Sequence, residues 1–266
     1  MESSRAFFGV PREYQALLEQ LGLTAAARIF DDPRIVPWRS IPERENCTLD
    51  ATLADGRAIR LHIKRYRPTG LRKSPGEQEA DGILALELAG IPTAPLVAWG
   101  KLEDGRSFLV TEDLAGFAPA DRLIEAGTPF DRLLEPTADL AARLHGSNLH
   151  HRDLYLCHFF VKLDAGKVEL RLIDPARVRH LPIWPLRQRW IVKDLAQFWY
   201  STLALPISDR QRQAWMAAYG RRRGIASVDG LVRSVIRKSD RIARHDAKLR
   251  RSQPGRNISI PQGERQ

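Results

Sequence analysis

The order of apolar and polar residues divides the chain into a first part that predicts strands and a later part that predicts helices. Residues 48–54 and 57–64 flank Asp55-Gly56, a dipeptide typical of a two-residue hairpin turn. Two further apolar runs at 96–99 and 108–111 are short enough to be strands. The first part of the chain therefore predicts an antiparallel sheet of about five strands.

Helical periodicity predicts one helix beside this sheet and several helices after it. Residues 74–89 have Ser74 as an N-cap and are followed by Gly90, which ends the helix. The later helices are expected at 121–126, 130–145 and 190–203. This pattern indicates an α+β protein with two lobes, a small antiparallel-sheet lobe carrying one helix and a mainly helical lobe.

The expected boundaries follow from the same change of periodicity. They are an N-terminal arm at 1–47, a small lobe at 48–113, a helical lobe at 114–251 and a loose tail at 252–266. Within the arm we expect a short helix at 11–21 and then irregular chain, in which Trp38 and Ile41 pack the arm onto the body.

Composition narrows the class of protein and of partner. The 266 residues are 43% apolar and 28% charged, as in ordinary globular proteins, but 42 Lys and Arg against 32 Asp and Glu give a net charge of +10. This favours an anionic partner. Two cysteines do not form a disulfide framework, and no stretch approaches eighteen consecutive apolar residues. We expect a cytosolic or peripheral protein.

The segment His151-Arg152-Asp153 holds the most specific chemistry in the chain. A His-Arg-Asp loop followed five residues later by a polar ligand is the layout of a kinase catalytic loop. In that layout the Asp accepts the proton of the attacking hydroxyl group, and the later residue, usually Asn, helps to hold a metal ion. Here the later residue is His158.

A second acid follows at the position that this interpretation requires. Residues 164–167 form a turn, and the apolar run from Val168 to Ile173 ends in Asp174, which predicts a hairpin that brings a carboxylate beside the catalytic loop. Kinases bind magnesium with an Asp at this place. An Asp before Pro175 is also a common turn signal, so the motif alone is not specific.

Lys64 and an acid of the next helix complete the kinase pattern. Lys64 ends the strand in which Ile59, Leu61 and Ile63 alternate with polar residues, and Glu77 and Glu79 lie early in the helix. Kinases use a strand Lys held by a helix Glu to contact nucleotide phosphates, and we choose Glu79 as that partner. Glu112 lies in the segment after the last small-lobe strand, where backbone groups could meet an adenine edge.

The last quarter of the chain is strongly basic. Six cations recur at spacings of three and four residues, which places them on one face of a helix, with Val232, Val235, Ile242 and Leu249 opposite. The six are Arg233, Arg237, Arg241, Arg244, Lys248 and Arg251. Such a stripe is either a solvated face or a surface that docks on an anionic membrane. Nucleic acid is not expected, because no interleaved aromatics or recognisable module accompany the stripe.

Taken together, the motifs resemble those of the lipopolysaccharide core kinases, the heptose and Kdo kinase family. The resemblance covers roughly residues 64–200. It is carried by Ile63-Lys64-Arg65-Tyr66, Glu79, Ala89-Gly90-Ile91-Pro92-Thr93, Thr111-Glu112-Asp113-Leu114, Leu144-His145, His151 to Leu156 with His158-Phe159, Ile173-Asp174, Arg189-Trp190 and Lys193-Asp194-Leu195. Tyr155 and His158 resemble this family and differ from general protein kinases, as does the absence of a glycine-rich loop between residues 43 and 64.

The resemblance implies a protein-kinase-like fold, ATP and Mg²⁺ as cofactors, and a role for each motif residue. Lys64, oriented by Glu79, would contact the ATP phosphates, and Asp153 would align and deprotonate a sugar hydroxyl group. Asp174, with His158, would hold magnesium, although His158 could instead bond Asp153 or Asp174. The acceptor would be a heptose or Kdo sugar of the lipopolysaccharide inner core at the cytoplasmic face of the inner membrane.

Two other functions remain open at the level of the sequence. A soluble kinase of aminoglycoside or choline type would share the roles of Asp153 and Asp174, but would favour an acidic acceptor pocket and a later-loop Asn. A non-catalytic, kinase-shaped protein could dock on an anionic surface through the basic stripe, although Lys64, Asp153 and Asp174 are all retained. Two further polar residues are expected to support the loop: His145 by bonding its backbone, and Asp194 by bracing it from the helix at 190–203.

Overall fold

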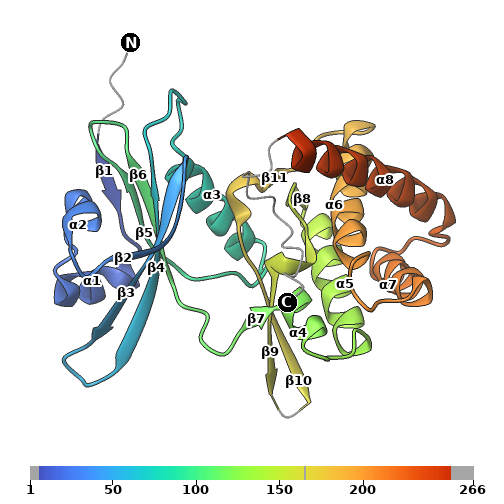
Figure 1. Ribbon diagram of the computed structural model, residues 1–266, viewed down its shortest axis with the longest axis horizontal. Helices are drawn as coiled ribbons and strands as arrows, with labels where there is room; N and C mark the ends of the chain where they lie inside the picture. The colour runs from blue at the N-terminus through green and yellow to red at the C-terminus, as the bar shows by residue number, and fades with distance from the viewer. Residues whose placement is uncertain (1–5, 165, 253–266) are drawn as a thin grey trace. The chain divides into compact units, whose positions relative to one another are not determined.

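The computed structural model describes residues 6–164 and 166–252, which form two compact units (Figure 1). Unit 1 lies within Met1–Leu88, Thr93–Ala115 and Pro175–Arg177. Unit 2 lies within Ala89–Pro92, Gly116–Asp174 and Val178–Gln266. The described residues form antiparallel sheets and eight α-helices, so the mixed α and β content expected from the sequence is present. The predicted tail at 252–266 lies outside the described residues after Ser252.

Unit 1 is built on a six-stranded antiparallel sheet with the order β1-β5-β6-β4-β3-β2. The strands are β1 (Phe7–Gly9), β2 (Val36–Ile41), β3 (Arg44–Thr52), β4 (Ala58–Tyr66), β5 (Leu96–Lys101) and β6 (Ser107–Glu112). Its helical segments are η1 (Arg12–Tyr14), α1 (Gln15–Leu21), α2 (Ala26–Asp31), α3 (Pro75–Leu88) and η3 (Pro175–Arg177). The predicted hairpin at Asp55-Gly56 joins β3 to β4.

The region expected to be an irregular arm contributes two strands to this sheet. β1 pairs with β5, and β2 pairs with β3 at the other edge, so the expectation of irregular chain after residue 21 was wrong. Trp38 lies on the edge strand β2 with 58% of its surface exposed, and therefore does not anchor the segment. An edge strand of this kind has no buried face, which is why its sequence shows no alternation.

The two faces of the sheet carry different helices. Leu18 of α1 and Ile29 of α2 pack with Leu49 and Leu61 in the larger core, whereas Ile83 of α3 packs with residues of the opposite face. α3 approaches its neighbours closely through two glycines. A Cβ atom at Gly76 would lie 2.5 Å from the carbonyl oxygen of Phe108, and one at Gly82 would lie 2.0 Å from that of Pro175. These contacts fix the helix that carries Glu79.

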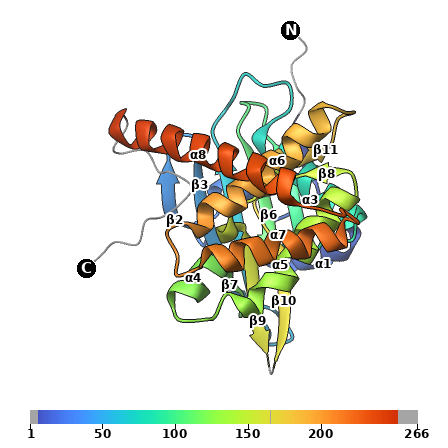
Figure 2. The same ribbon diagram turned by 90° about the vertical axis from the view of Figure 1, so that its right-hand side faces the viewer.

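Unit 2 is mainly helical. Its helices are α4 (Ala120–Glu125), α5 (Asp131–Gly146), α6 (Leu186–Thr202), α7 (Asp209–Arg222) and α8 (Asp229–Ser252), with a short η2 (Leu156–His158). Three strands, β7 (Ala118–Pro119), β9 (Phe159–Asp164) and β10 (Lys167–Leu172), form one sheet in the order β10-β9-β7. β8 (Leu149–His150) pairs with β11 (Arg179–His180). Figure 2 shows α8 lying across the unit.

An aromatic stack forms the centre of unit 2. Phe198 of α6 lies parallel to Trp215 of α7 with 3.9 Å between ring centroids, and Phe159 of β9 meets Phe198 edge-on at 5.5 Å. The indole N–H of Trp215 donates to the hydroxyl oxygen of Thr137 on α5 at 2.9 Å, so its polar atom is satisfied inside the core. This stack holds α6 rigidly behind the loop that follows β8. Among the described residues no helix is both long and apolar enough to span a bilayer.

Candidate active site

In unit 1, a buried carboxylate holds the strand lysine. Lys64 Nζ donates to Glu79 Oε1 at 2.5 Å, and the hydroxyl group of Tyr66 donates to Glu79 Oε2. The side chain of Glu79 is 3% exposed and that of Lys64 is 24% exposed, so the ammonium group reaches solvent while its partner does not. Lys64 and Tyr66 share a face of β4 because alternate residues of a strand point the same way.

The choice of Glu79 rather than Glu77 as the partner of Lys64 is confirmed. Glu77 accepts hydrogen bonds from the backbone N–H and the hydroxyl group of Ser74, at 2.9 and 2.7 Å, and so caps the start of α3. The two acids differ in role because they are two positions apart on a helix, which turns them to different sides.

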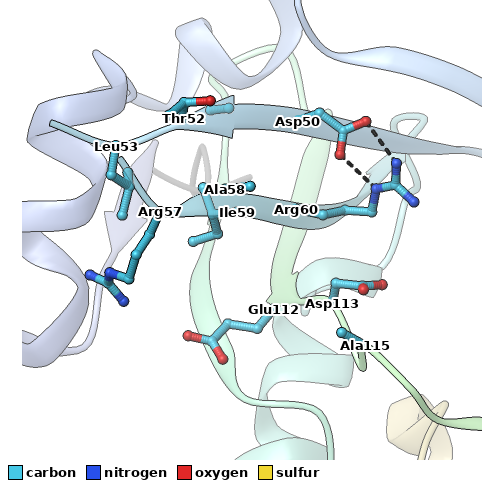
Figure 3. Close-up of a pocket in the computed structure, with 11 residues that line it drawn as sticks. Asp50, Thr52, Leu53, Arg57, Ala58, Ile59, Arg60, Glu112, Asp113 and Ala115 are labelled. Atoms are coloured by element: carbon cyan, nitrogen blue, oxygen red, sulfur yellow. Dashed lines mark hydrogen bonds and ion pairs between the residues drawn. The ribbon is translucent and has the colours of Figure 1, made fainter. Parts of the chain in front are cut away.

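Glu112 lines an open pocket of about 760 Å³ in unit 1 (Figure 3). The pocket lies between the hairpin of β3 and β4 and the segment that leaves β6. Asp50 and Arg60 form a two-point ion pair at 2.6 and 2.9 Å on one side of it. Burial and the carboxylate of Glu112 raise the pKa of Tyr14. Glu112, expected in the segment after the strand, is the last residue of β6 and lies at this polar pocket.

The next acid, Asp113, is bonded to a residue of the lysine strand. Its Oδ1 atom accepts from His62 Nε2 at 2.6 Å, and its backbone N–H donates to the carbonyl oxygen of Arg60 at 3.0 Å. His62 lies two residues before Lys64 and shares its face of β4. The sequence interpretation gave no role to His62, because a His alternating within a strand is no distinct signal.

In unit 2, one face of α6 binds the backbone of the catalytic loop. Asp194 accepts from the backbone N–H groups of His151 and Arg152 at 2.6 and 2.8 Å. Further along the same face, Gln197 Oε1 accepts from the N–H of Leu154 at 3.3 Å, and Ser201 Oγ accepts from that of Leu156 at 2.9 Å. Residues 194, 197 and 201 are spaced by three and four, so they line one stripe of the helix. The predicted bracing by Asp194 is confirmed.

His145 supports the loop through Asp194. Its Nε2 atom lies 3.3 Å from Asp194 Oδ2, and its Nδ1 atom lies 2.8 Å from the hydroxyl oxygen of Tyr219. Because a carboxylate can only accept, Nε2 carries the proton of the contact with Asp194. Burial alone would raise the pKa of Asp194, but the hydrogen bonds and positive potential of His145 and His151 lower it. His145 was expected to bond the loop backbone directly, and it acts instead through this carboxylate.

Asp153 presents its carboxylate from this braced loop. Gln197 Nε2 lies 3.4 Å from Asp153 Oδ1, at the long limit of a hydrogen bond, and the side chain is only partly buried. The carbonyl oxygen of Asp153 accepts from the N–H of Tyr155 at 2.9 Å and lies 2.6 Å from His158 Nδ1. The backbone of the residue is therefore fixed on both sides. A carboxylate so placed can accept a proton and orient a hydroxyl group.

His158 bridges Asp153 and Asp174. Because its Nδ1 atom faces a carbonyl oxygen, Nδ1 must carry a proton, and Nε2 lies 3.8 Å from Asp174 Oδ2. Burial opposes its charged form, but contact with Cys157 and the carboxylate of Asp174 raise the pKa of His158 to about 9. Of the two roles left open for His158, this geometry favours the brace between the two acids over metal ligation.

Asp174 is held by the backbone that precedes it. The N–H of Ile173 donates to the carbonyl oxygen of His158 at 3.0 Å, and the carbonyl oxygen of Ile173 lies 3.2 Å from His151 Nε2. Asp174 has a left-handed backbone with φ of 59°, a conformation that costs energy for a residue other than Gly. Its side chain is 32% exposed. The hairpin of β9 and β10 thereby delivers a carboxylate beside the catalytic loop, as predicted.

Metal binding is tested by the donor atoms of these residues. Within the described ranges, no group of three or more His, Cys, Asp and Glu side chains is arranged to hold a metal ion. Magnesium in phosphoryl-transfer sites is bound by one or two carboxylates together with substrate phosphates and water. Asp174, a carboxylate that is 32% exposed, can supply one oxygen ligand of that kind.

Three supports of the loop were missed from the sequence. Gln197 and Ser201 bind loop backbone, and Lys193 Nζ donates to the carbonyl oxygen of Arg152 at 2.9 Å. The signal was present, because all three lie in the predicted helix at 190–203 near Asp194. It could be used only once the helix face that meets the loop was known.

Comparison with known proteins agrees with this geometry. The family model described as "Lipopolysaccharide kinase (Kdo/WaaP) family" matches residues 24–219. The lipopolysaccharide core heptose(I) kinase WaaP of Pseudomonas aeruginosa is 31% identical over 166 residues, 54% of this chain and 59% of that protein. The protein of the same name from Escherichia coli is 29% identical over 181 residues, 62% of this chain and 67% of that protein.

The match with the family model covers the candidate-site residues of both unit 1 and unit 2. The chain spans 59% of the length of the Pseudomonas aeruginosa relative, and the family model includes Lys64, Asp153, Asp174 and the bracing face of α6. The chain therefore belongs to the lipopolysaccharide kinase (Kdo/WaaP) family.

Proposed function

We propose that this protein is an ATP-dependent kinase that phosphorylates a sugar hydroxyl group, of heptose or Kdo, in the inner core of lipopolysaccharide. The observation that carries the proposal is the carboxylate of Asp153, presented by a loop whose backbone N–H groups are bound by Asp194, Gln197 and Ser201. Such immobilisation suits phosphoryl transfer, in which positioning and charge neutralisation supply most of the rate enhancement. The named function of the two relatives supports the choice of acceptor.

The two units are, in this proposal, the two lobes of a bilobal protein-kinase-like fold. Unit 1 supplies an antiparallel sheet with a Lys-bearing strand and one helix that carries the paired Glu. Unit 2 supplies the catalytic loop and the acid-bearing hairpin on a helical body. These are the parts that kinases distribute between their lobes.

In unit 1, Lys64 contacts the phosphates of ATP. Its side chain is 24% exposed, and the ammonium group is held by the Glu79 carboxylate, which also accepts a hydrogen bond from Tyr66. A flexible lysine side chain loses rotational freedom about several bonds when it binds a ligand. A buried partner that already orders the side chain reduces this entropic cost of binding. Glu79 acts through Lys64 and is a positioning residue. The pocket at Glu112 belongs to the nucleoside end of the same site in this proposal.

In unit 2, Asp153 aligns the sugar hydroxyl group and accepts its proton as the oxygen attacks the terminal phosphate. Gln197 steadies one carboxylate oxygen of Asp153 from 3.4 Å. His158 contacts the carbonyl oxygen of Asp153 through Nδ1 and lies close to the carboxylate of Asp174 through Nε2, so the ring fixes the positions of the two acids relative to each other.

Asp174 would hold the Mg²⁺ ion. When bound, the ion neutralises charge on the transferring phosphoryl group. The Nε2 atom of His158 lies 3.8 Å from Asp174 Oδ2 and helps to position this carboxylate.

The acceptor places the enzyme at the cytoplasmic face of the inner membrane, where ATP is available. The six cations of the basic stripe are all exposed on α8, whereas Val235 is buried and Asp246 is turned inward to Tyr200, 2.6 Å from its hydroxyl group. One exposed face of α8 therefore carries mostly positive charge, which suits anionic lipid. Replacing Arg237, Arg241 and Arg244 with Gln is expected to weaken binding to anionic vesicles at low salt, with the difference shrinking at high salt.

The test of the acceptor class is phosphate transfer from γ-labelled ATP with magnesium to a panel of acceptors. The panel contains lipopolysaccharide core glycolipid, its deacylated core oligosaccharide, aminoglycosides and choline. Label in the two core acceptors, and in neither amino-alcohol class, is the expected result. Label only in an amino-alcohol would replace the proposal with a soluble small-molecule kinase, and ATP binding without transfer to any acceptor would indicate a non-catalytic protein.

A further inference from the structure

A short apolar segment of unit 2 projects into solvent between β11 and α6. We call residues 182–186 the apolar tip. Ile183 is 85% exposed, Trp184 is 79% exposed and Leu186 is 50% exposed. Single exposed apolar residues are common on protein surfaces, but three large ones within four consecutive positions form a contiguous patch, which usually marks a binding surface.

The apolar tip has a well-anchored base. Leu181, immediately before it, is 5% exposed and donates its backbone N–H to the carbonyl oxygen of Asn148 at 2.7 Å. Immediately after it, Arg187 donates to the side-chain oxygen of Asn148 at 3.0 Å, and its backbone N–H donates to the carbonyl oxygen of Ile183 at 3.2 Å. Both ends of the tip are thus tied to one residue, so the exposed side chains are held out by structure.

The same base is joined to the catalytic loop. Arg179 of β11 pairs with His150 of β8, the residue before His151-Arg152-Asp153. Trp190, one helical turn after the tip, lies 4.8 Å from the ring of His150 and stacks on the guanidinium group of Arg152 at 4.5 Å. Whatever the apolar tip binds is therefore brought into fixed relation with Asp153.

Charge around the tip restricts the chemistry of its partner. Within unit 2, no Asp or Glu occurs between Val178 and Asp194, whereas four Lys and Arg do. The four are Arg179, Arg187, Arg189 and Lys193. A protruding Trp and Ile, bordered by cations and free of acids, match the surface of an anionic bilayer, where Trp sits at the headgroup level and basic residues meet phosphate.

We propose that the apolar tip inserts into the interface of an anionic lipid bilayer and so presents Asp153 to an acceptor carried in that bilayer. The presentation of Asp153 to an acceptor rests on the proposed function, whereas the insertion of the apolar tip does not. The anchor differs from the basic stripe of α8 in its physics. Apolar insertion depends on buried area and is insensitive to salt, whereas attraction by the stripe is screened.

The test uses the full chain and vesicles of phosphatidylethanolamine and phosphatidylglycerol, without ATP or acceptor. Replacing Ile183 and Trp184 together with Ser is expected to lower the partition coefficient roughly tenfold or more, at both low and high salt, from the loss of two large apolar side chains. Both positions are exposed, so the variant should fold, which an unchanged thermal midpoint would verify.

A matched pair of variants separates insertion from other effects. Trp184→Phe keeps an apolar ring and should bind vesicles nearly as the wild type does. In vesicles made with brominated lipid, the wild type should lose tryptophan fluorescence that Trp184→Phe does not lose, because only Trp184 reaches the lipid. Trp184→Ser should lose both binding and quenching.

These vesicle experiments test the insertion of the apolar tip separately from the proposed kinase function. Vesicle binding by the double Ser variant equal to wild type, or no quenching that depends on Trp184, would overturn it. A wild type that dimerises in solution through residues 183 and 184 would assign the apolar tip to a second copy of the chain instead. Failure of phosphate transfer to every acceptor would leave the insertion result standing. Retained transfer to deacylated core oligosaccharide by the double Ser variant, with loss on the membrane-bound glycolipid, is the result expected if both are correct.

Discussion

Replacing Asp194 with Asn tests the claim that α6 holds the catalytic loop in its working shape. The side chain is fully buried, and its two oxygens accept from the N–H groups of His151 and Arg152 and from His145. Asn has one acceptor oxygen and one donor NH₂ group, so at least one N–H would face another donor. A lost charge-assisted bond contributes about 1.5–3 kcal/mol and an unsatisfied buried donor costs about 1–3 kcal/mol, which together predict about 2.5–6 kcal/mol lost from the free energy of unfolding.

The assay combines urea unfolding with steady-state kinetics. Asp240→Asn is the matched control, because this substitution makes the same chemical change at an exposed position of α8. The control should stay within about 0.5 kcal/mol of wild type, as surface substitutions do. If Asp194 positions the loop, the variant that remains folded should also show a large fall in kcat with little change in the KM for ATP. Equal stability of Asp194→Asn and the control, with unchanged kcat, would refute the bracing role.

Three further results are expected. Glu79→Gln should raise the KM for ATP several-fold because Lys64 loses its charged partner, whereas Glu77→Gln should alter only helix stability. Calorimetric titration of both variants with nucleotide measures this difference, and equal affinities of the two variants would contradict it. Gln197→Ala should lower kcat with an unchanged KM for ATP, since it frees the Asp153 loop without touching nucleotide; an unchanged kcat would remove Gln197 from the site. Burial lowers the pKa of His150 from 6.5 to about 4. Between these two pH values the unfolded chain therefore binds a proton at His150 that the folded chain does not bind. Stability should therefore fall as the pH drops from about 6.5 towards about 4, by about 1.4 kcal/mol per pH unit for each such group, and His150→Gln should show a shallower urea-midpoint profile than wild type. Identical profiles would contradict this.

The regular parts of the fold were accessible from the sequence where one face of an element is buried. α5 was predicted at 130–145 and is observed at Asp131–Gly146, because its apolar residues recur with helical period and line the core. The hairpin at Asp55-Gly56 was equally clear from its turn residues. β2 was missed because an edge strand with an exposed face carries no alternation.

α7 was missed although its start signal is present in the sequence. Ser208 and Gln211 form a capping box at its beginning, which the pattern Ser-x-x-Gln announces. The arginines around the buried Trp215 and Tyr219 conceal the apolar stripe of this helix. Local charge can therefore hide a helix whose core-facing residues are few and large.

At the site, the sequence located the acids and one support, Asp194, but not Gln197 or Ser201. Asp153 and Asp174 follow from fixed motif spacing, and the pairing of Lys64 with Glu79 follows from strand and helix order. The contacts of Gln197 and Ser201 depend on how α6 meets the loop, which is a tertiary fact that no local pattern contains. The exposed tip at Ile183 and Trp184 is similar, since its sequence alone would suggest buried residues.

The most direct test of the central claim is transfer of label from γ-labelled ATP to lipopolysaccharide core by three proteins side by side. These are the wild type, Asp153→Asn, and the control Asp164→Asn at the exposed end of β9. Equal labelling by the wild type and the control is expected. No labelling is expected by Asp153→Asn, which should still bind ATP with unchanged affinity. Substantial labelling by Asp153→Asn would contradict the role assigned to this carboxylate and, with it, the proposed mechanism.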